Sequence, residues 1–161
     1  MELAHKSETG VVVVRGLKPE DLEAVIAIDA KNTGRRREEF FKVKLKQNLA
    51  ETGIKVSLAA EIDGCFCGFL LARVYYGEFG APEPVAVLDT LDVHPDFRRR
   101  GVGAALMRQL CVNLNGLRVS RLRTEVDWDT PELFTFFRGQ GFRPAERLCL
   151  DLALPRSGRE E

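Results

Sequence analysis

The sequence predicts an α/β (α+β) fold in which a mixed sheet has helices on both faces. Runs of strand-forming residues alternate along the chain with segments whose apolar residues recur every three or four positions. The run Cys65–Tyr76 is apolar on both of its alternating faces, which is expected of a strand covered by helices on both sides. Asp63-Gly64 joins this run to the preceding one and is a strong hairpin pattern.

The first third of the chain predicts one strand and two helices. Val11–Arg15 is a β-branched run and predicts the first strand. Pro19 suits the first turn of a helix, and apolar residues at helical spacing follow it. A second helix is expected over Arg36–Glu51, where apolar residues recur at steps of four. These residues are Phe41, Leu45 and Leu49.

The middle of the chain predicts three strands and a long helix. Val56–Ile62 and Cys65–Tyr76 form the hairpin, and a loop rich in glycine and proline follows at Gly77–Pro84. Val85–Val93 predicts the next strand. A helix opens at Gly101 and reaches Asn115, because the Asn115-Gly116 pair is a natural stop.

The last third predicts a strand, a short helix and a closing strand. Val119–Val126 is the strand, and Thr130-Pro131 opens a helix that ends at Gly141. Arg147–Leu154 predicts the final strand. The polar ends, 1–9 and 155–161, are expected to fray. The element order β-α-α-β-β-β-α-β-α-β therefore describes a single domain over 1–161, with an ordered core of about 10–154.

The composition is that of a chain with its own core, and it argues against two classes of partner. Of 161 residues 45% are hydrophobic, and 24 basic side chains balance 24 acidic ones. Nucleic-acid binders usually have a basic excess, so no nucleic-acid partner is expected. No apolar run is long enough to span a bilayer, and Met1–Gly10 lacks the apolar core of a signal peptide. We expect a cytoplasmic protein that does not bind membranes.

The cysteines do not predict a metal site. Cys65-x-Cys67 lacks both the Cys-x-x-Cys spacing and the second pair of a zinc centre. We expect four buried and inert thiols, and no metal. They are Cys65, Cys67, Cys111 and Cys149.

The segment Leu91–Leu106 has the composition of a phosphate site. A strand ends at Val93, a loop with three arginines follows, and a helix begins at once. Glycines at 101 and 103 allow the backbone to approach a ligand closely. The unpaired first amides of a helix suit a phosphate, and nearby arginines add charge-assisted bonds.

Two phosphate-binding motifs fit this segment poorly. The chain contains no Gly-x-x-x-x-Gly-Lys-Ser/Thr, which excludes a P-loop. A dinucleotide fingerprint needs a third glycine where this chain has Leu106, and it needs the motif directly after a first strand. Gly101-x-Gly103 is therefore the only support for a nucleotide-binding domain.

The residues Arg98-x-x-Gly101-x-Gly103, after a strand ending Leu-Asp-Val-His-Pro, resemble the pyrophosphate motif of the GNAT superfamily of N-acetyltransferases. The segment from Glu125 to Gly141-Phe142 is similar to the second motif of the superfamily. The resemblance covers most of the chain. It implies the GNAT fold, acetyl-CoA as co-substrate, and transfer of an acetyl group to a primary amine by direct attack.

The resemblance also implies positions for the co-substrate. Backbone amides of the loop and the helix start would hold the pyrophosphate. The end of the preceding strand would pair its main chain with the pantetheine arm, and an amide near Val93 would polarise the thioester oxygen. Thr130 replaces the usual asparagine beside the pantetheine, and its hydroxyl still has the chemistry to cap the helix. The implied cofactor-binding residues are Leu91, Asp92, Val93, Arg98, Arg99, Arg100, Gly101, Val102, Gly103, Ala104, Thr130 and Phe137.

Acetyl transfer to an amine needs a base, because an ammonium group has no lone pair. Glu125 is the favoured base, since it occupies the position of a glutamate in members that acetylate protein N-termini. Asp92 and Asp89 on the preceding strand are its competitors. His94 precedes Pro95 in a loop and is interpreted as a turn residue.

The usual proton donor is missing. The superfamily position that is commonly tyrosine is Phe137, and the tyrosines of this chain lie on another strand, at 75 and 76. Either water protonates the leaving thiolate, or one of these tyrosines does, or the chain binds acetyl-CoA without turning it over. The alternative function is therefore a non-catalytic acyl-CoA-binding or regulatory module.

The acceptor and the oligomeric state are less defined by the sequence. Arg35–Arg37 suits an acidic acceptor or a solvated helix start, and Glu38 or Glu78 has the charge to receive an ammonium group. After Gly141-Phe142 the closing strands look shortened, which would leave an edge for a partner subunit. A homodimer is expected on that basis.

Overall fold

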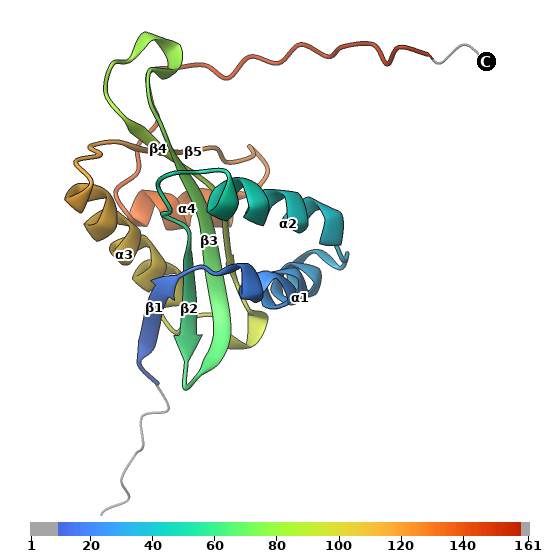
Figure 1. Cartoon of the computed structure of the whole chain (residues 1–161), viewed down its shortest axis with the longest axis vertical. Coiled ribbons are helices and arrows are strands. Elements are labelled where there is room, and N and C mark those ends of the chain that lie inside the picture. The colour runs from blue at the N-terminus through green and yellow to red at the C-terminus, as the bar shows by residue number, and fades with distance from the viewer. Residues whose placement is uncertain (1–9, 159–161) are drawn as a thin grey trace, which may run out of the picture. The chain divides into compact units, whose positions relative to one another are not determined.

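The computed structural model describes residues 10–158 (Figure 1). The chain comprises two compact units that divide between residues 127 and 128, and each is described by itself. The prediction of one domain over 1–161 stays a prediction. The expected fraying at 1–9 lies outside the described residues.

Residues 10–127 form a mixed sheet, as the sequence predicts, and it has five strands where six were expected. Its strands lie in the order β1-β2-β3-β4-β5, antiparallel except for the parallel pair β4–β5. The strands are β1 (Val12–Gly16), β2 (Leu58–Ile62), β3 (Cys65–Tyr75), β4 (Val85–Val93) and β5 (Leu122–Thr124). The α-helices of this unit are α1 (Leu22–Thr33), α2 (Glu38–Leu45) and α3 (Val102–Gly116).

Helices cover both faces of this sheet, with α1 and α2 on one face and α3 on the other (Figure 1). The alternation of side chains along β3 explains the arrangement. Phe69 packs with its ring centroid 6.1 Å from that of Phe41, inside the core cluster built by α1 and α2. The neighbouring Gly68 faces α3, because a Cβ there would meet Val102 Cγ1 at 2.8 Å. The missing side chain lets the first turn of α3 lie close to the sheet.

A β-bulge modifies the expected faces of β3. Ala60 pairs with Gly68 and Glu61 with Phe66, so Cys67 is the extra residue. Phe66 therefore packs beside Phe69, at a ring-centroid distance of 6.5 Å, rather than on the opposite face as the simple alternation predicts.

The prediction of four buried thiols is wrong for three of them. Only Cys67 is buried, and its burial raises the pKa of the thiol to about 11. Its Sγ lies 3.4 Å from the Ala60 carbonyl. The other three cysteines are exposed. Cys65 lies next to a turn, Cys111 on the outer side of α3, and Cys149 in a segment without regular structure.

The second helix is shorter than the predicted Arg36–Glu51. The α-helix ends at Leu45, and residues 46–50 form a wider π turn in which Glu51 N donates to Lys46 O at 2.9 Å. The buried Asn48 donates its side-chain amide to Lys44 O at 2.8 Å. A polar side chain that bonds to the preceding turn competes with regular helix packing, which the apolar spacing does not reveal.

The second unit contains the helix α4 (Pro131–Gly139). Thr130 is its N-cap as predicted, but no capping bond from its hydroxyl is present. Phe137 packs edge-on against Phe142, with ring centroids 5.1 Å apart.

The predicted last strand, Arg147–Leu154, is absent from the described structure. Residues 147–154 contain neither helix nor strand, and their four leucines are 78–87% exposed. The alternating leucines are typical of a strand, but a strand forms only where a neighbour accepts its backbone hydrogen bonds. These leucines are Leu148, Leu150, Leu152 and Leu154.

Candidate functional site

The last residues of β4 have an open backbone edge. Only Ala86–Leu88 pair with β5, whereas Thr90–Val93 pair with β3 alone among the described strands. His94 N donates to Cys67 O on β3 at 2.8 Å. Because backbone direction alternates along an antiparallel strand, Leu91 and Val93 direct their amide and carbonyl groups toward the open edge. This edge offers main-chain groups to an extended ligand.

The loop after β4 leads directly into α3. His94 closes a short turn by accepting the Asp96 amide on Nδ1 at 3.1 Å, which agrees with its interpretation as a turn residue. Arg99 and Gly101 then adopt left-handed backbone angles, with φ of 61° and 76°. The first helical bond runs from Ala105 N to Gly101 O at 2.9 Å, so the amides at 102–104 have no partner inside the helix. These amides lie where the sequence predicts a phosphate cradle, and that role stays a prediction.

Asn32, near the end of α1, joins the end of β4 to this loop. Its Nδ2 donates to Val93 O at 3.0 Å and makes a second, short bond to Asp92 Oδ1. Its Oδ1 accepts from Arg98 Nη2 at 2.6 Å. Asn32 is not predictable from the sequence, because one amide near the end of a helix has no pattern that distinguishes it from a surface residue.

Asp92 is held by one of its two carboxylate oxygens. Oδ1 accepts from Asn32 and from the Val93 amide, the latter at 3.1 Å. No described residue donates a hydrogen bond to Oδ2. The Val93 amide, which was expected to polarise a thioester oxygen, is thus bonded to Asp92 in this structure. Of the groups that face the open edge, those of Leu91 stay available.

The environment of Asp92 favours its protonated form. Burial raises the pKa of this carboxyl to about 6, and the nearby Asp29 carboxylate adds to the rise. The bonds from Asn32 and the Val93 amide, and the charge of Arg98, act in the opposite direction. Asp29 itself is paired with Arg37, whose Nε lies 2.9 Å from Asp29 Oδ2. Asp92 is therefore a carboxyl that changes charge close to neutral pH.

The other candidate bases differ from Asp92 in their surroundings. Glu125 follows β5 directly and is exposed. Asp89 lies further back on β4 and forms an ion pair with Lys44 Nζ at 3.0 Å. Of the three carboxylates, Asp92 is the one next to the loop, and its burial raises its pKa.

The remaining predicted residues fall into two groups. Residues 91–93 and 98–104 lie on one continuous segment, the end of β4, its loop and the first turn of α3. Thr130 and Phe137 belong to the second unit, so the structure does not place them beside this segment. Of the two tyrosines, Tyr75 ends β3 under the Arg73 guanidinium, and Tyr76 is 60% exposed.

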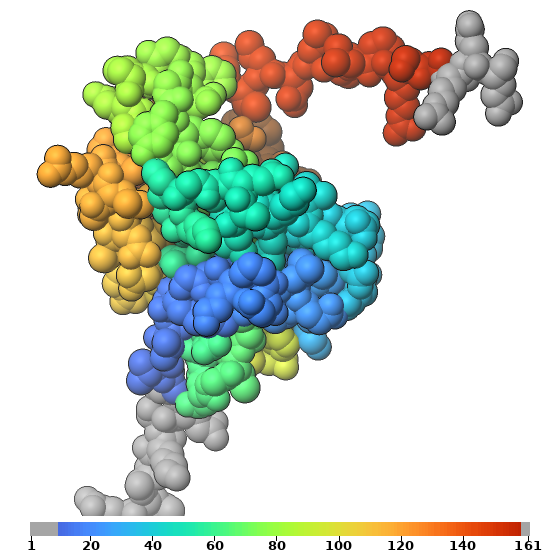
Figure 2. Space-filling view, viewed as in Figure 1, coloured from blue at the N-terminus to red at the C-terminus, as the bar shows by residue number. Residues whose placement is uncertain are grey.

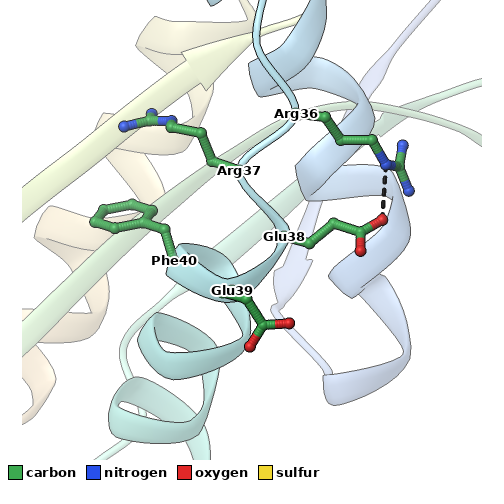
Figure 3. Close-up of a pocket in the computed structure, with 5 residues that line it drawn as sticks. All are labelled: Arg36, Arg37, Glu38, Glu39 and Phe40. Atoms are coloured by element: carbon green, nitrogen blue, oxygen red, sulfur yellow. Dashed lines mark hydrogen bonds and ion pairs between the residues drawn. The ribbon is translucent and has the colours of Figure 1, made fainter.

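An open hollow of about 520 Å³ lies at the start of α2 (Figure 3). Arg37 lies 4.7 Å from the centre of the Phe40 ring, and Arg36 pairs with Glu38 at 2.7 Å. Two arginines and two glutamates line the hollow, so the formal charges of its lining cancel. The lining residues are Arg36, Arg37, Glu38, Glu39 and Phe40.

The hollow is on the same helical layer as Asn32. Segments of α1 and α2 lie side by side on one face of the molecule (Figure 2). Arg37 connects the hollow to the Asp29 carboxylate on α1, one helical turn before Asn32. Asp92 does not line the hollow, but Arg37, which does, interacts electrostatically with the Asp92 carboxylate.

Residues 10–158 contain no cluster of three or more histidine, cysteine, aspartate or glutamate side chains that could hold a metal ion. In the same part of the chain, no helix has the length and apolar character needed to cross a membrane.

The family to which the chain is similar decides between the phosphate-binding alternatives. The model of the acetyltransferase (GNAT) family matches residues 22–142, about three quarters of the chain. The chain belongs to this family. The predicted family and fold are confirmed, and with them the enzyme class, an acyltransferase that uses acetyl-CoA. The match spans the whole segment from α1 through the loop to Phe142.

Solved structures show the same fold at low sequence identity. The aminoglycoside N-acetyltransferase AAC(6')-Iy in complex with CoA has a TM-score of 0.75 at 18% identity, over 89% of this chain and 95% of that one. A ribosomal-protein-alanine N-acetyltransferase from Brucella melitensis biovar Abortus 2308 has a TM-score of 0.71 at 20% identity, over 90% and 100% of the two chains. A transcriptional regulator from Bacillus halodurans C-125 has a TM-score of 0.73 at 16% identity, over 89% and 100%. No curated protein matches the sequence significantly.

Proposed function

We propose that this acetyltransferase transfers the acetyl group of acetyl-CoA to a primary amine by direct attack, with Asp92 as the base. The observation that carries the proposal is the Asp92 carboxyl itself. It is fixed through Oδ1, it has Oδ2 available, and it lies where β4 enters the phosphate loop. Two of the similar structures are amine acetyltransferases by name, which supports an amine acceptor.

The residues of the β4–α3 segment fit a bound CoA. The amides at 102–104 are available for a pyrophosphate at the positive end of the α3 dipole. The open edge at Leu91 offers main-chain bonds to the amides of a pantetheine arm. Gly68 lets the first turn of α3 lie close to the sheet and so places the cradle near this edge.

Asp92 has the pKa of a useful base. With the pKa at about 6, the carboxylate is ionised at pH 7 and still binds a proton readily. It accepts a proton from the ammonium group of the acceptor, and the neutral amine then attacks the acetyl carbonyl carbon. A C–N bond forms, the attacking nitrogen releases its second proton to solvent water, the C–S bond breaks, and the CoA thiolate leaves. Glu125 stays the second candidate for this role.

Water is proposed to protonate the thiolate. Phe137 has no hydroxyl group, and its ring packs against Phe136 and Phe142. A thiolate is stable enough near neutral pH to leave without a dedicated acid. Protonation of the thiolate therefore needs no dedicated side chain, whereas removal of the amine proton needs a base.

The hollow at the start of α2 is proposed to receive the remote part of the acceptor. Glu38 is already paired with Arg36, and Glu39 with Lys42 at 2.8 Å, so neither carboxylate presents an isolated charge. The exposed Phe40 ring gives the hollow an apolar wall. We infer that the acceptor is a compact amine without a strong net charge beyond its ammonium group.

A thiol-release assay over a panel of amines tests the proposed function. The expected result is acetyl-CoA-dependent release of free CoA with at least one primary amine. Acetyl-CoA at a hundred times its dissociation constant should also stabilise the fold by about 2.7 kcal/mol. Stabilisation without transfer to any amine would favour the acyl-CoA-binding or regulatory module, for which the missing hydroxyl at Phe137 is the argument. Stabilisation by NAD or ATP instead would contradict the proposal.

The cytoplasmic location, the homodimer and the absence of a nucleic-acid partner also stay proposals. The exposed leucines of 147–154 are the feature that favours association, because alternating apolar side chains suit burial against a sheet edge. Sedimentation velocity on the purified chain measures the oligomeric state directly.

A further inference from the structure

Asn32 contacts the candidate base and the phosphate loop with the two ends of one amide. Its nitrogen holds Asp92 Oδ1 and the Val93 carbonyl, and its oxygen accepts from Arg98 Nη2 at 2.6 Å. The three partners come from the end of β4 and from the loop that follows, whereas Asn32 comes from α1. One side chain thus connects the helix layer to both parts of the site.

We propose that Asn32 is a positioning residue that fixes the Asp92 carboxylate and the Arg98 side chain in a single arrangement. The inference rests on the proposed function, in which Asp92 is the base. Asn32 does not touch the reacting atoms; it holds Oδ1 of Asp92, which leaves Oδ2 to accept the proton. It also orders the loop by holding Arg98, so that the phosphate cradle forms before CoA arrives.

The chemistry of an amide suits this role better than any charged side chain. Asp92 is surrounded by groups of both signs, the Asp29 carboxylate and Arg37 guanidinium from the helical side and Arg98 from the loop. An amide donates to a carboxylate and accepts from a guanidinium without adding a charge. A lysine at position 32 would lose the second contact, and an aspartate would lose the first.

Two substitutions separate the two contacts. Asn32→Ala removes both the donor to Asp92 and the acceptor for Arg98. Asn32→Asp keeps nearly the same shape and the acceptor for Arg98, but it replaces the donor by a second carboxylate. Asn113→Ala is the matched control, because Asn113 is also half-buried and its amide oxygen accepts from the Gln109 amide at 2.8 Å on α3.

The titration of Asp92 is measured by ¹³C NMR of the carboxyl carbon in the ligand-free protein. Asn32→Ala should move its midpoint upward by about one pH unit, since one hydrogen bond to the charged form is lost. Turnover at pH 6 should then fall about fivefold from this change alone, with little loss at pH 8. Asn32→Asp should move the midpoint further upward, because a like charge is added beside Asp92.

Binding of CoA gives the second readout. Asn32→Ala should weaken it by roughly three- to tenfold, because the bond that orders Arg98 is lost. Asn32→Asp should bind CoA within about twofold of the parent, since its acceptor is retained. Asn113→Ala should change neither quantity. An unchanged Asp92 titration in both Asn32 variants would overturn the inference. Full activity of Asp92→Asn would instead refute the base of the proposed function, while the NMR titration and CoA binding still decide the role of Asn32.

Discussion

Replacing Asp92 by asparagine removes one charge from the site and keeps the shape of the side chain. The amide oxygen still accepts from Asn32 and from the Val93 amide, so the end of β4 should keep its structure. The base, however, is lost. Turnover should fall by roughly a hundred- to ten-thousandfold, the range for a positioned general base, whereas CoA binding should change little.

The same substitution should stabilise the fold at neutral pH. The pKa of Asp92 is raised from the ordinary 3.8 to about 6, a difference worth about 3 kcal/mol for a fully buried group. Partial exposure to solvent reduces this figure to roughly 1.5 kcal/mol. Because folding favours the protonated form, the parent loses this stability as the pH rises from about 4 to about 6. Asparagine stays neutral and does not lose it.

Thermal unfolding of parent and Asp92→Asn at pH 4, 6 and 8 measures the effect. The variant should melt about 3 to 6 °C above the parent at pH 8, and the difference should shrink toward pH 4. Asp89→Asn is the control on the same strand. It breaks the ion pair with Lys44, so it should lower stability by at most about 1 kcal/mol.

Either of two results would refute this reasoning. Lower stability of Asp92→Asn at pH 8 would mean that the carboxylate is stabilised where it lies, and that burial does not dominate its pKa. Unchanged turnover would remove Asp92 from the proton path. If Glu125→Gln lost activity in the same assay, the base would lie after β5, at the position that the sequence resemblance favours.

Three further substitutions test the site and its support. Gly68→Ala should lower the free energy of unfolding by about 1 to 3 kcal/mol and weaken CoA binding, because the added Cβ would meet Val102 Cγ1 at 2.8 Å and displace the first turn of α3. Normal CoA binding would contradict the argument that α3 must lie close to Gly68. Gly101→Val should abolish CoA binding, since φ is 76° at this position and a β-branched residue is strained in that region. Titration calorimetry measures the affinity for CoA, and an unchanged affinity would contradict the prediction. Asp21→Ala should destabilise the fold above pH 4 and have less effect at lower pH, as measured by urea titration. Burial raises the pKa of Asp21, but hydrogen bonds from Arg15 and the Lys18 amide bring the pKa below 3.8, so the carboxylate stabilises the fold only where it is ionised. An equal destabilisation at pH 2 would refute this.

Much of the secondary structure of residues 10–127 is predictable from the sequence, because the interactions that determine it are local. The strand Val85–Val93 has the predicted bounds, and α3 begins within one residue of the predicted start. Asp63-Gly64 forms the expected turn, with positive φ at both residues. Turn chemistry, helix starts and strand periodicity depend on neighbours in sequence, so the chain itself specifies them.

The residues of the candidate site are predictable from the sequence only in part. The helix start at 102–104, where a phosphate cradle is proposed, follows from two glycines and a helix pattern that are adjacent in sequence. The preference for Asp92 over Glu125 does not follow from the sequence, because it depends on burial and on the contact with Asn32, which lies 60 residues away. A pKa is decided by what surrounds a group in space, and single-sequence patterns do not contain that information.

The C-terminal leucines also show which features the sequence determines and which it does not. Their alternation in Arg147–Leu154 is as regular as in any strand of the sheet, yet no strand forms there in the described structure. Periodicity predicts which side chains share a face, and it fails in β3 only where the bulge at Cys67 moves Phe66 to the side of Phe69. Whether a face is covered and whether a backbone finds its hydrogen-bond partner depend on elements far apart in the chain. Only the tertiary structure decides these two questions, because burial and strand pairing are properties of two surfaces and not of one.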